Sequence, residues 1–340
     1  MKRILFLLSF VALIFGCQNK DIAFPDFAFQ AVYFPYQTPI RTLSLGDEEL
    51  GDNSIDLQRA FSIGAAVGGA YENKKNRVLT IGLEPGLAAN ITDGSGKDLR
   101  LLPAGYYKTT FDKISIPAGS SFGKFRIDLT DAFFADPLTT ELNYVIPVRI
   151  KYAEGDSILS GKPNVTNPDP RILAHWAVQP KNFVLFAIKY INATHGIYLL
   201  RGKRTNLNNP LDIVRYSTRF LDDNDMTSLT TQSLVDNLMS TVGGTNKVAS
   251  NARYSMKLSF NEKEKSVIVG QKDLTTVVVN GSGKFYSKTD IAAEGYNGKK
   301  HRTIYLNYTY VDGVNRYQVN DSLVFVDTNL KFEEFAVRVR

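Results

Sequence analysis

The chain has 340 residues, of which 44% are hydrophobic and 22% charged, and its formal net charge is +6 at pH 7. The positive charges are spread along the chain without a long basic stripe, so nucleic acid is not an expected partner. The only cysteine, Cys17, excludes an internal disulfide, so burial of a core must stabilise the mature chain.

The first element is a short apolar leader that ends at this cysteine. A basic start precedes an apolar run over residues 4–15. That run is shorter than the roughly 20 residues that a helix needs to span a bilayer, and the pattern is typical of a secretory leader. We therefore expect residues 1–16 to be a signal peptide and residues 17–27 to be a polar tether.

The end of the leader also predicts a lipid anchor. Residues 14–17, Ile-Phe-Gly-Cys, resemble the bacterial lipobox, which is cleaved before the cysteine. This resemblance implies that the thiol of Cys17 carries diacylglycerol. Lys20 and Asp21 resemble the charged signal that sends some Bacteroidetes lipoproteins to the outside of the outer membrane. We expect a lipid-anchored outer-membrane protein exposed at the cell surface.

Short stretches in which apolar and polar residues alternate follow the tether. In the first half they are residues 78–81, 113–116, 124–129 and 144–150. A period of two is typical of half-buried strands, and such strands without long helices between them predict a sandwich of two antiparallel sheets. We place this sandwich at residues 28–155. Pro147 lacks the amide donor of a central ladder, so we expect its strand at a sheet edge or with a bulge.

A second strand-rich region follows a stretch rich in proline and small polar residues. We assign residues 156–174 as a linker and residues 175–340 as the second domain. Its strand patterns are residues 184–188, 196–200, 254–260, 266–269, 276–279, 303–310 and 334–340. This number of strands could close into an antiparallel barrel without exposed edges. Residues 228–239 fit either a helix, by their apolar spacing, or strands, by their threonines.

No pattern in the sequence specifically indicates catalysis, a metal or a cofactor. Residues 119–123 match the Gly-x-Ser-x-Gly pattern of hydrolases, but a strand pattern follows where a nucleophile elbow needs a helix. The glycines therefore predict a hairpin loop. Residues 222–225, Asp-Asp-Asn-Asp, lack the glycine and distal glutamate of a helical calcium loop and predict a solvated turn. We expect no catalytic residue and no metal site.

The three histidines, His175, His195 and His301, do not show the spacing of metal ligands. Residues 299–302, Lys-Lys-His-Arg, lie beside glycine and asparagine and predict a solvated turn rather than an anion site.

Aromatic residues offer the main indication of a ligand. The chain has 17 tyrosines, and sugar-binding surfaces use aromatic rings because a pyranose stacks on a flat apolar face. Tyr308 and Tyr310 share one face of their strand and Tyr305 takes the other, so part of this group must be core. Trp176, the only tryptophan, is a candidate ligand platform or a packing residue at the domain junction.

Five motifs resemble a two-domain family of Bacteroidetes lipoproteins. Residues 102–107, 114–120 and 144–148 resemble its N-terminal domain, of the domain of unknown function 1735 type. Residues 175–178 and 189–202, the latter with Lys-Tyr-Ile-Asn, His-Gly-x-Tyr and Arg-Gly steps, resemble its C-terminal domain of the 4361 type. The resemblance implies an all-β fold: an immunoglobulin-like sandwich followed by a calycin-like (lipocalin-like) barrel.

The same resemblance implies a role in glycan capture. Members of the family occur beside outer-membrane glycan importers, so we expect a non-catalytic lipoprotein that binds polysaccharide for an uptake system. Transporter components are further expected partners. Two alternatives stay open: a scaffold or adhesion protein that binds other proteins, and a barrel that encloses a lipid. Family membership assigns no ligand residues.

Overall fold

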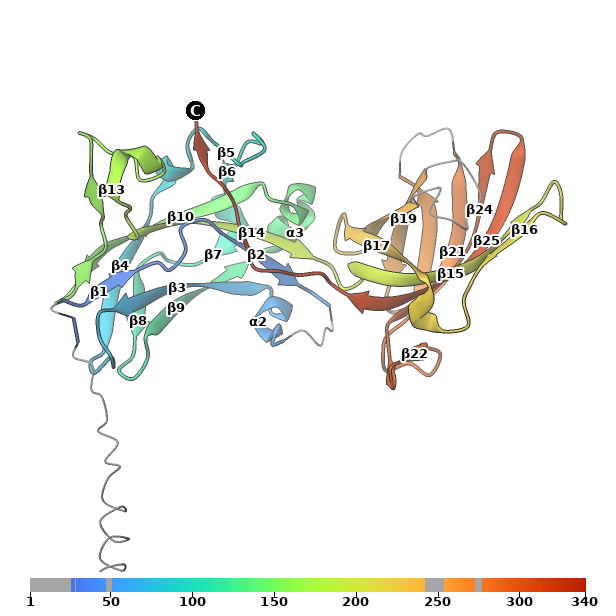
Figure 1. The fold of residues 1–340 in the computed structure, drawn as a ribbon, viewed down its shortest axis with the longest axis horizontal. Helices are drawn as coiled ribbons and strands as arrows, with labels where there is room; N and C mark the ends of the chain where they lie inside the picture. Colours follow the sequence, from blue (N-terminus) through green and yellow to red (C-terminus); the bar gives the residue numbers. More distant parts are fainter. Residues whose placement is uncertain (1–25, 28, 47–50, 242–253, 273–276) are drawn as a thin grey trace, which may run out of the picture.

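A two-sheet sandwich and a closed barrel lie side by side in the computed structural model of the chain (Figure 1). The structure describes residues 26–27, 29–46, 51–241, 254–272 and 277–340. Its helical elements are α2 (Ser54–Leu57), α3 (Asp131–Ala135), η1 (Pro85–Ala88), η2 (Ala104–Tyr106), η3 (Pro137–Thr140), η4 (Leu173–His175) and η5 (Leu221–Asp223). The prediction of an all-β fold is confirmed. Within the described ranges, no helix combines the length and the apolar character that crossing a membrane requires.

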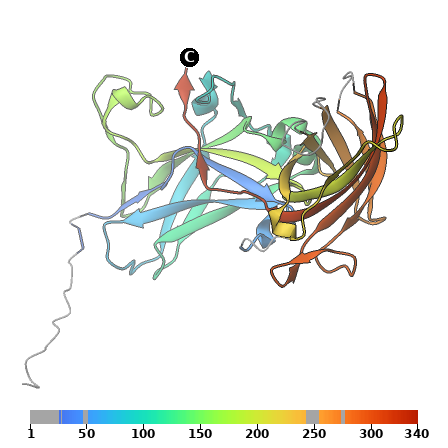
Figure 2. The same ribbon diagram turned by 45° about the vertical axis from the view of Figure 1, so that its right-hand side comes forward.

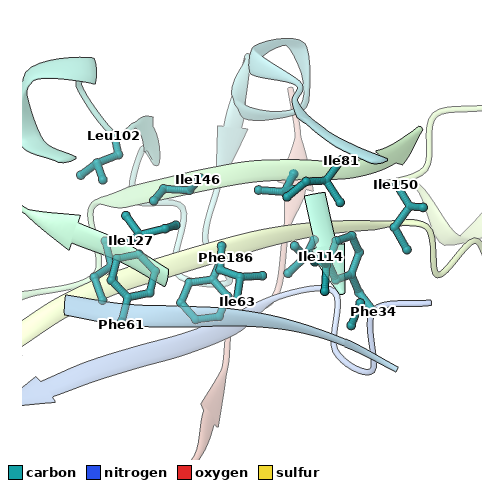
Figure 3. Close-up of a cluster of buried hydrophobic side chains, with 14 of the residues drawn as sticks. Phe34, Phe61, Ile63, Ile81, Leu102, Ile114, Ile127, Ile146, Ile150 and Phe186 are labelled. Atoms are coloured by element: carbon teal, nitrogen blue, oxygen red, sulfur yellow. The ribbon is translucent and has the colours of Figure 1, made fainter. Parts of the chain in front are cut away.

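The sandwich consists of two facing sheets. In spatial order, the first contains β11 (Ser157–Ile158), β1 (Ala31–Tyr33), β3 (Ala60–Gly68), β9 (Phe122–Leu129) and β7 (Tyr107–Lys108). The second contains β26 (Glu333–Glu334), β2 (Pro39–Ser44), β14 (Phe183–Ile191), β10 (Tyr144–Ala153), β4 (Arg77–Leu83) and β8 (Lys113–Ile116), and β6 (Arg100–Leu101) pairs with β10. Their inner side chains meet in one apolar core (Figure 3). Phe61 of the first sheet stacks on Phe186 of the second, with ring centroids 5.3 Å apart.

β14 corrects the predicted start of the second domain at residue 175. This strand lies inside the sandwich, between β2 and β10. Phe186 and Ile188 pack in the sandwich core, whereas Leu185 and Ala187 pack in a second cluster on the other side of the sheet. A strand that is buried on both faces has a continuous apolar sequence, which carries no sign of the domain to which it belongs.

The predicted linker, residues 156–174, is also part of the sandwich. β11 pairs with β1 in parallel, and the chain then forms a small hairpin of β12 (Lys162–Pro163) and β13 (Trp176–Val178). The prolines of this stretch interrupt pairing only locally. Trp176 thus belongs to this hairpin, which we call the sandwich excursion (residues 162–178), and not to the domain junction.

Pro147 occupies the middle of a sheet, and its strand carries a bulge, the second of the two predicted arrangements. It lies opposite Leu185 of β14, whose N–H donates to Gln37 O on the far side, so this pair exchanges no hydrogen bonds. The nitrogen of Pro147 therefore faces the other edge of β10. Along that edge β6 pairs with β10 before Pro147 and β4 pairs with it after Pro147, so the missing N–H lies between the two partners. The bulge of this strand lies further along, between Ile150 and Tyr152.

The second domain is a closed antiparallel barrel, as predicted. Its strands, in order around the barrel, are β15 (Gly196–Asn206), β17 (Asp225–Thr231), β18 (Asp236–Thr241), β19 (Tyr254–Asn261), β20 (Ser266–Gln271), β21 (Val279–Tyr286), β24 (Thr303–Asp312) and β25 (Asn315–Asp327). Pairing of β25 with β15 closes it, and β16 (Ile213–Tyr216) adds to the far end of β15. The small hairpin of β22 (Gly295–Tyr296) and β23 (Lys299–Lys300) lies between β21 and β24.

Buried side chains fill the inside of the barrel. Met239, Met256, Leu258 and Tyr310 are all 0% exposed and belong to one apolar cluster. The ambiguous residues 228–239 form parts of β17 and β18 and not a helix, because their pairing places Leu229 opposite Met239 inside the barrel.

The chain crosses between the two domains twice. Four residues, 192–195, separate β14 from β15. After β25 the chain returns to the sandwich, where β26 pairs with β2 and β27 (Arg338–Val339) pairs with β5 (Ile91–Thr92). Figure 2 shows this C-terminal segment running from the barrel across the sandwich.

Candidate ligand-binding site

The outer face of the barrel carries two parallel rows of polar side chains, which we call the polar rows. Strand register aligns the first row across β16, β15, β25, β24 and β21: Arg215, Lys203, Asn320, Asn307 and Ser282. The second row crosses β15, β25, β24 and β21: Arg201, Ser322, Tyr305 and Lys284. Because neighbouring strands lie about 4.8 Å apart, the first row extends over roughly 19 Å.

The polar rows line an open hollow of about 590 Å³, to which Ser217 also contributes. This volume is in the range of small-molecule sites, about 300 to 1,000 Å³. The strands concerned are grouped on one side of the barrel in Figure 1. A ligand here would contact amides, hydroxyls, cations and one aromatic ring.

Alternation along each strand explains why these side chains face outward. Tyr308 and Leu306 of β24 are buried inside the barrel, so Tyr305 and Asn307 point to the outer face. The predicted separation of Tyr305 from Tyr308 and Tyr310 is confirmed. Burial raises the pKa of Tyr305 to about 12, and the nearby Glu294 carboxylate adds to the effect. Its hydroxyl therefore stays protonated at neutral pH and can donate a hydrogen bond.

Glu294 fixes one side of the second row. Its carboxylate forms an ion pair with the guanidinium of Arg201 and accepts a hydrogen bond from the Ser322 hydroxyl. These contacts orient Arg201 and Ser322 beside the hollow. Both partners of Glu294 are thereby held in place before any ligand arrives, which lowers the entropic cost of binding.

Directly beneath the rows lies Asp321, a buried acid. Its side chain accepts hydrogen bonds from the hydroxyls of Tyr216 and Tyr308, the latter at 3.0 Å. Burial raises the pKa of Asp321 to about 6. Gly202 permits this arrangement, because a Cβ at that position would lie 2.8 Å from Cε2 of Tyr216. The buried hydrogen bonds support the inner side of the strands that carry the polar rows.

A second cavity, of about 540 Å³, lies at the domain junction. The sandwich contributes Leu45 and Leu57, and the barrel contributes Phe285, Phe325 and Arg302, among others. Arg302 is not part of a solvated turn as predicted. Its guanidinium donates to the carbonyls of Ala193 and His195 and lies 4.1 Å from the ring centroid of Phe325. This arginine is therefore a structural link between the interdomain connection and the barrel.

The residues singled out in the sequence do not gather at the polar rows. Cys17 lies outside the described residues. Trp176 is half-buried, donates through its indole N–H to Asp169 O at 2.8 Å, and covers Gly161. It is a packing residue of the sandwich excursion, which Figure 1 shows at the end of the molecule opposite the barrel.

The three histidines occupy separate structural settings. His175 accepts from the N–H of Asp169, and His301 stacks on Tyr296. His195 lies at the domain junction, where burial, assisted by the charges of Arg302 and Lys189, lowers its pKa to about 4. In the described part of the chain, no three histidine, cysteine or acidic side chains are grouped as metal ligands would be.

Residues 119–121 belong to a loop between the two sheets rather than to the predicted hairpin loop, and residues 122–123 begin β9. The preceding strand, β8, pairs with β4 in the second sheet, whereas the following strand, β9, pairs with β3 in the first. The Ser120 hydroxyl is occupied within the loop, where it donates to Phe122 O at 2.8 Å. In residues 222–225, Asn224 closes a local turn by accepting from the N–H of Thr218.

Comparison with known proteins covers both domains. A family of N-terminal domains matches residues 26–157, and the family described as Domain of unknown function (DUF5627) matches residues 193–329. The second match differs from the 4361 type that the motifs suggested, and the 1735 type of the first domain stays a prediction. Among curated proteins, none matches the chain.

Solved structures from Bacteroides are similar to the chain. A structural-genomics protein of unknown function from Bacteroides ovatus is 34% identical, with a TM-score of 0.83 over 93% of this chain and 100% of that one. A second Bacteroides ovatus protein of unknown function is 14% identical, with a TM-score of 0.44 over 90% and 99% of the two chains. An auxiliary nutrient binding protein from Bacteroides thetaiotaomicron VPI-5482 is 12% identical, with a TM-score of 0.37 over 80% and 85%. From this match at 34% identity over 93% of its length, the chain belongs to the same family as the first Bacteroides ovatus protein, a family of two-domain β proteins.

Proposed function

We propose that this chain is a non-catalytic, lipid-anchored surface protein that binds glycan for an outer-membrane uptake system, and that the polar rows form its binding site. The observation that carries the proposal is the alignment of amides, hydroxyls and a tyrosine ring on one open face. Sugar hydroxyls pair with such amides and hydroxyls, and the apolar face of a pyranose packs on a ring such as that of Tyr305.

The open shape of the hollow supports a polymeric ligand. The hollow is open to solvent, and the first of the polar rows crosses five strands, so a sugar chain of several residues could lie along it. The filled interior of the barrel argues against the alternative in which the barrel encloses a lipid.

The position of the sandwich supports anchoring at one end. Phe27, the residue where the tether joins the sandwich, donates its N–H to Gly69 O at the end of β3. Figure 1 shows that this end of the sandwich points away from the barrel. An anchor at Cys17 would therefore hold the sandwich near the membrane and the polar rows toward the medium.

Affinity gels test glycan binding. The chain without residues 1–16 and with Cys17→Ser would be run through gels that contain a panel of neutral and acidic polysaccharides. We expect retardation by at least one polysaccharide and a loss of about tenfold or more in affinity in Tyr305→Ser. Tyr152→Ser, which changes an exposed tyrosine of the sandwich, is the matched control and should bind normally.

Two results would count against the proposal. The first is no retardation across the panel. The second is equal binding by the Tyr305→Ser and Tyr152→Ser variants. Capture of a defined protein partner without any sugar would favour the scaffold alternative.

Metabolic labelling tests the anchor. Cells that express the full chain would be grown with labelled palmitate, and the label should appear on the wild type but not on Cys17→Ala. An unlabelled wild type would remove the anchor from the proposal and leave glycan binding to be judged by the gels.

A further inference from the structure

Two cations face each other directly at one end of the polar rows. Lys203 of β15 and Arg215 of β16 are register partners in an antiparallel pair, and both point to the outer face. Side chains in such positions have Cβ atoms about 5 Å apart, and like charges there destabilise the pairing. Folding alone does not favour this arrangement.

No counterion in the described residues relieves the repulsion between them. Lys203 and Arg215 form no ion pair or side-chain hydrogen bond with any residue in the described ranges, and the same holds for Lys284 at the other end of the second row. The fourth cation of the rows, Arg201, is already paired with Glu294. Three cations therefore remain available to a ligand.

The acidic groups nearby do not cancel these three charges. Glu294 is paired with Arg201, and Asp212 is paired with Arg204 on the inner side of β15. Asp321 is turned to the inside of the barrel, where two tyrosine hydroxyls bind it. The three available cations outnumber the single buried carboxylate, that of Asp321, so the hollow carries a net positive charge.

From this arrangement we infer that the polar rows select glycans that carry negative charges, as carboxylates or sulfate esters, and that Lys203 and Arg215 together hold one such group. The inference rests on the proposed function and adds the class of sugar. The Arg215 guanidinium can bind a carboxylate or sulfate through two parallel hydrogen bonds, and Lys203 adds a point charge. Asn320 and Asn307, the next residues of the row, are placed to bind the adjoining hydroxyls.

Paired polysaccharides that differ only in charge test the inference. Dextran and dextran sulfate share one backbone, as do methyl-esterified and free polygalacturonate, so each pair isolates the sulfate or the carboxylate. The wild type should bind at least one charged form about tenfold or more tightly than its neutral partner, and the affinity should fall between low and high salt.

The double variant Lys203→Gln/Arg215→Gln should lose about tenfold or more in affinity for that charged form. The matched control is Lys263→Gln/Arg338→Gln, which removes the same charge from two exposed residues outside the hollow. It should bind like the wild type. A second readout needs no ligand: the thermal stability of the Lys203→Gln/Arg215→Gln variant should equal or exceed that of the wild type, because the repulsion is removed.

The outcomes separate the inference from the proposed function. Equal loss of binding in both double variants, or no loss in either, overturns the inference. Binding of neutral glycans alone also overturns it while the proposed function stands. No binding to any polysaccharide overturns both.

Discussion

Asp321 is the residue where burial has the clearest consequence for stability. Its pKa is about 6 in the folded protein, against 3.8 for an ordinary aspartate, because burial disfavours the charged form. The folded state therefore binds more protons than the unfolded state between about pH 4 and pH 6. The contribution of Asp321 to the free energy of unfolding falls as the pH rises through this window.

We predict that Asp321→Asn becomes more stable relative to the wild type as the pH rises. The stability difference between the two proteins should change by about 2 kcal/mol in favour of the variant between pH 4 and pH 7. Denaturant unfolding of both proteins at the two pH values measures it. His195, with its lowered pKa, changes stability in the opposite direction with pH, but it is present in both proteins and cancels. An unchanged difference would show that Asp321 titrates normally.

At the residue scale, the sequence predicted on which face of a strand a side chain lies. It did not predict which residues of other strands lie beside that side chain. Alternation alone separated Tyr305 from Tyr308 and Tyr310, because the direction of a strand side chain is a local property. The polar rows escaped notice because their members lie between residues 201 and 322 on five strands, and only register brings them together. The pair of Lys203 and Arg215 is different, because β15 and β16 are consecutive antiparallel strands. Aligning these two strands in the sequence would place the two cations opposite each other.

At the scale of the element, glycines set how closely the barrel strands approach. A Cβ on Gly281 of β21 would lie 2.5 Å from Cα of Tyr308 and would also contact Asn307 O. Around Gly270 of β20, nothing lies within 4 Å of the corresponding position. The two glycines belong to neighbouring strands but face different surroundings.

We predict that Gly281→Ala lowers the free energy of unfolding by about 1 to 3 kcal/mol, because the added methyl group overpacks the contact between β21 and β24. Gly270→Ala should change it by less than about 0.5 kcal/mol. Chemical denaturation of the three proteins gives the comparison. Equal effects of the two substitutions would show that β21 and β24 do not pack as described.

β14 shows why an element can be recognised in a sequence and still be placed in the wrong domain. Its apolar run identified it as a strand, and it is one. Its partners are β10, in the preceding stretch of chain, and β2, more than a hundred residues earlier. No local signal reports such pairing. Pro147 likewise could not decide between an edge strand and a bulged one, because the pairing at the edge of β10 that it faces depends on where β6 and β4 end.

For the whole molecule, the C-terminal segment ties the two domains together. After leaving the barrel it adds β26 to the second sheet of the sandwich and pairs β27 with β5 in a small separate sheet, and Phe335 enters the cluster that covers the outer side of β14. The last strand pattern of the sequence was therefore assigned to the barrel in error. It completes the sandwich instead.

We predict that Phe335→Ala, which empties a position that is 6% exposed, destabilises the sandwich by about 3 to 5 kcal/mol. Phe332→Ala removes a ring that is 63% exposed from the same segment and should cost less than about 1 kcal/mol. Differential scanning calorimetry of the two variants measures both effects. A similar loss in each would mean that the segment does not dock through Phe335.

The location of a bound sugar tests the proposed site most directly. A crystal structure of the chain with an acidic oligosaccharide should show the sugar across the polar rows, with a ring against Tyr305 and a negative group between Lys203 and Arg215. A sugar seated in the cavity at the domain junction, or on the sandwich, with the polar rows empty, would contradict the account.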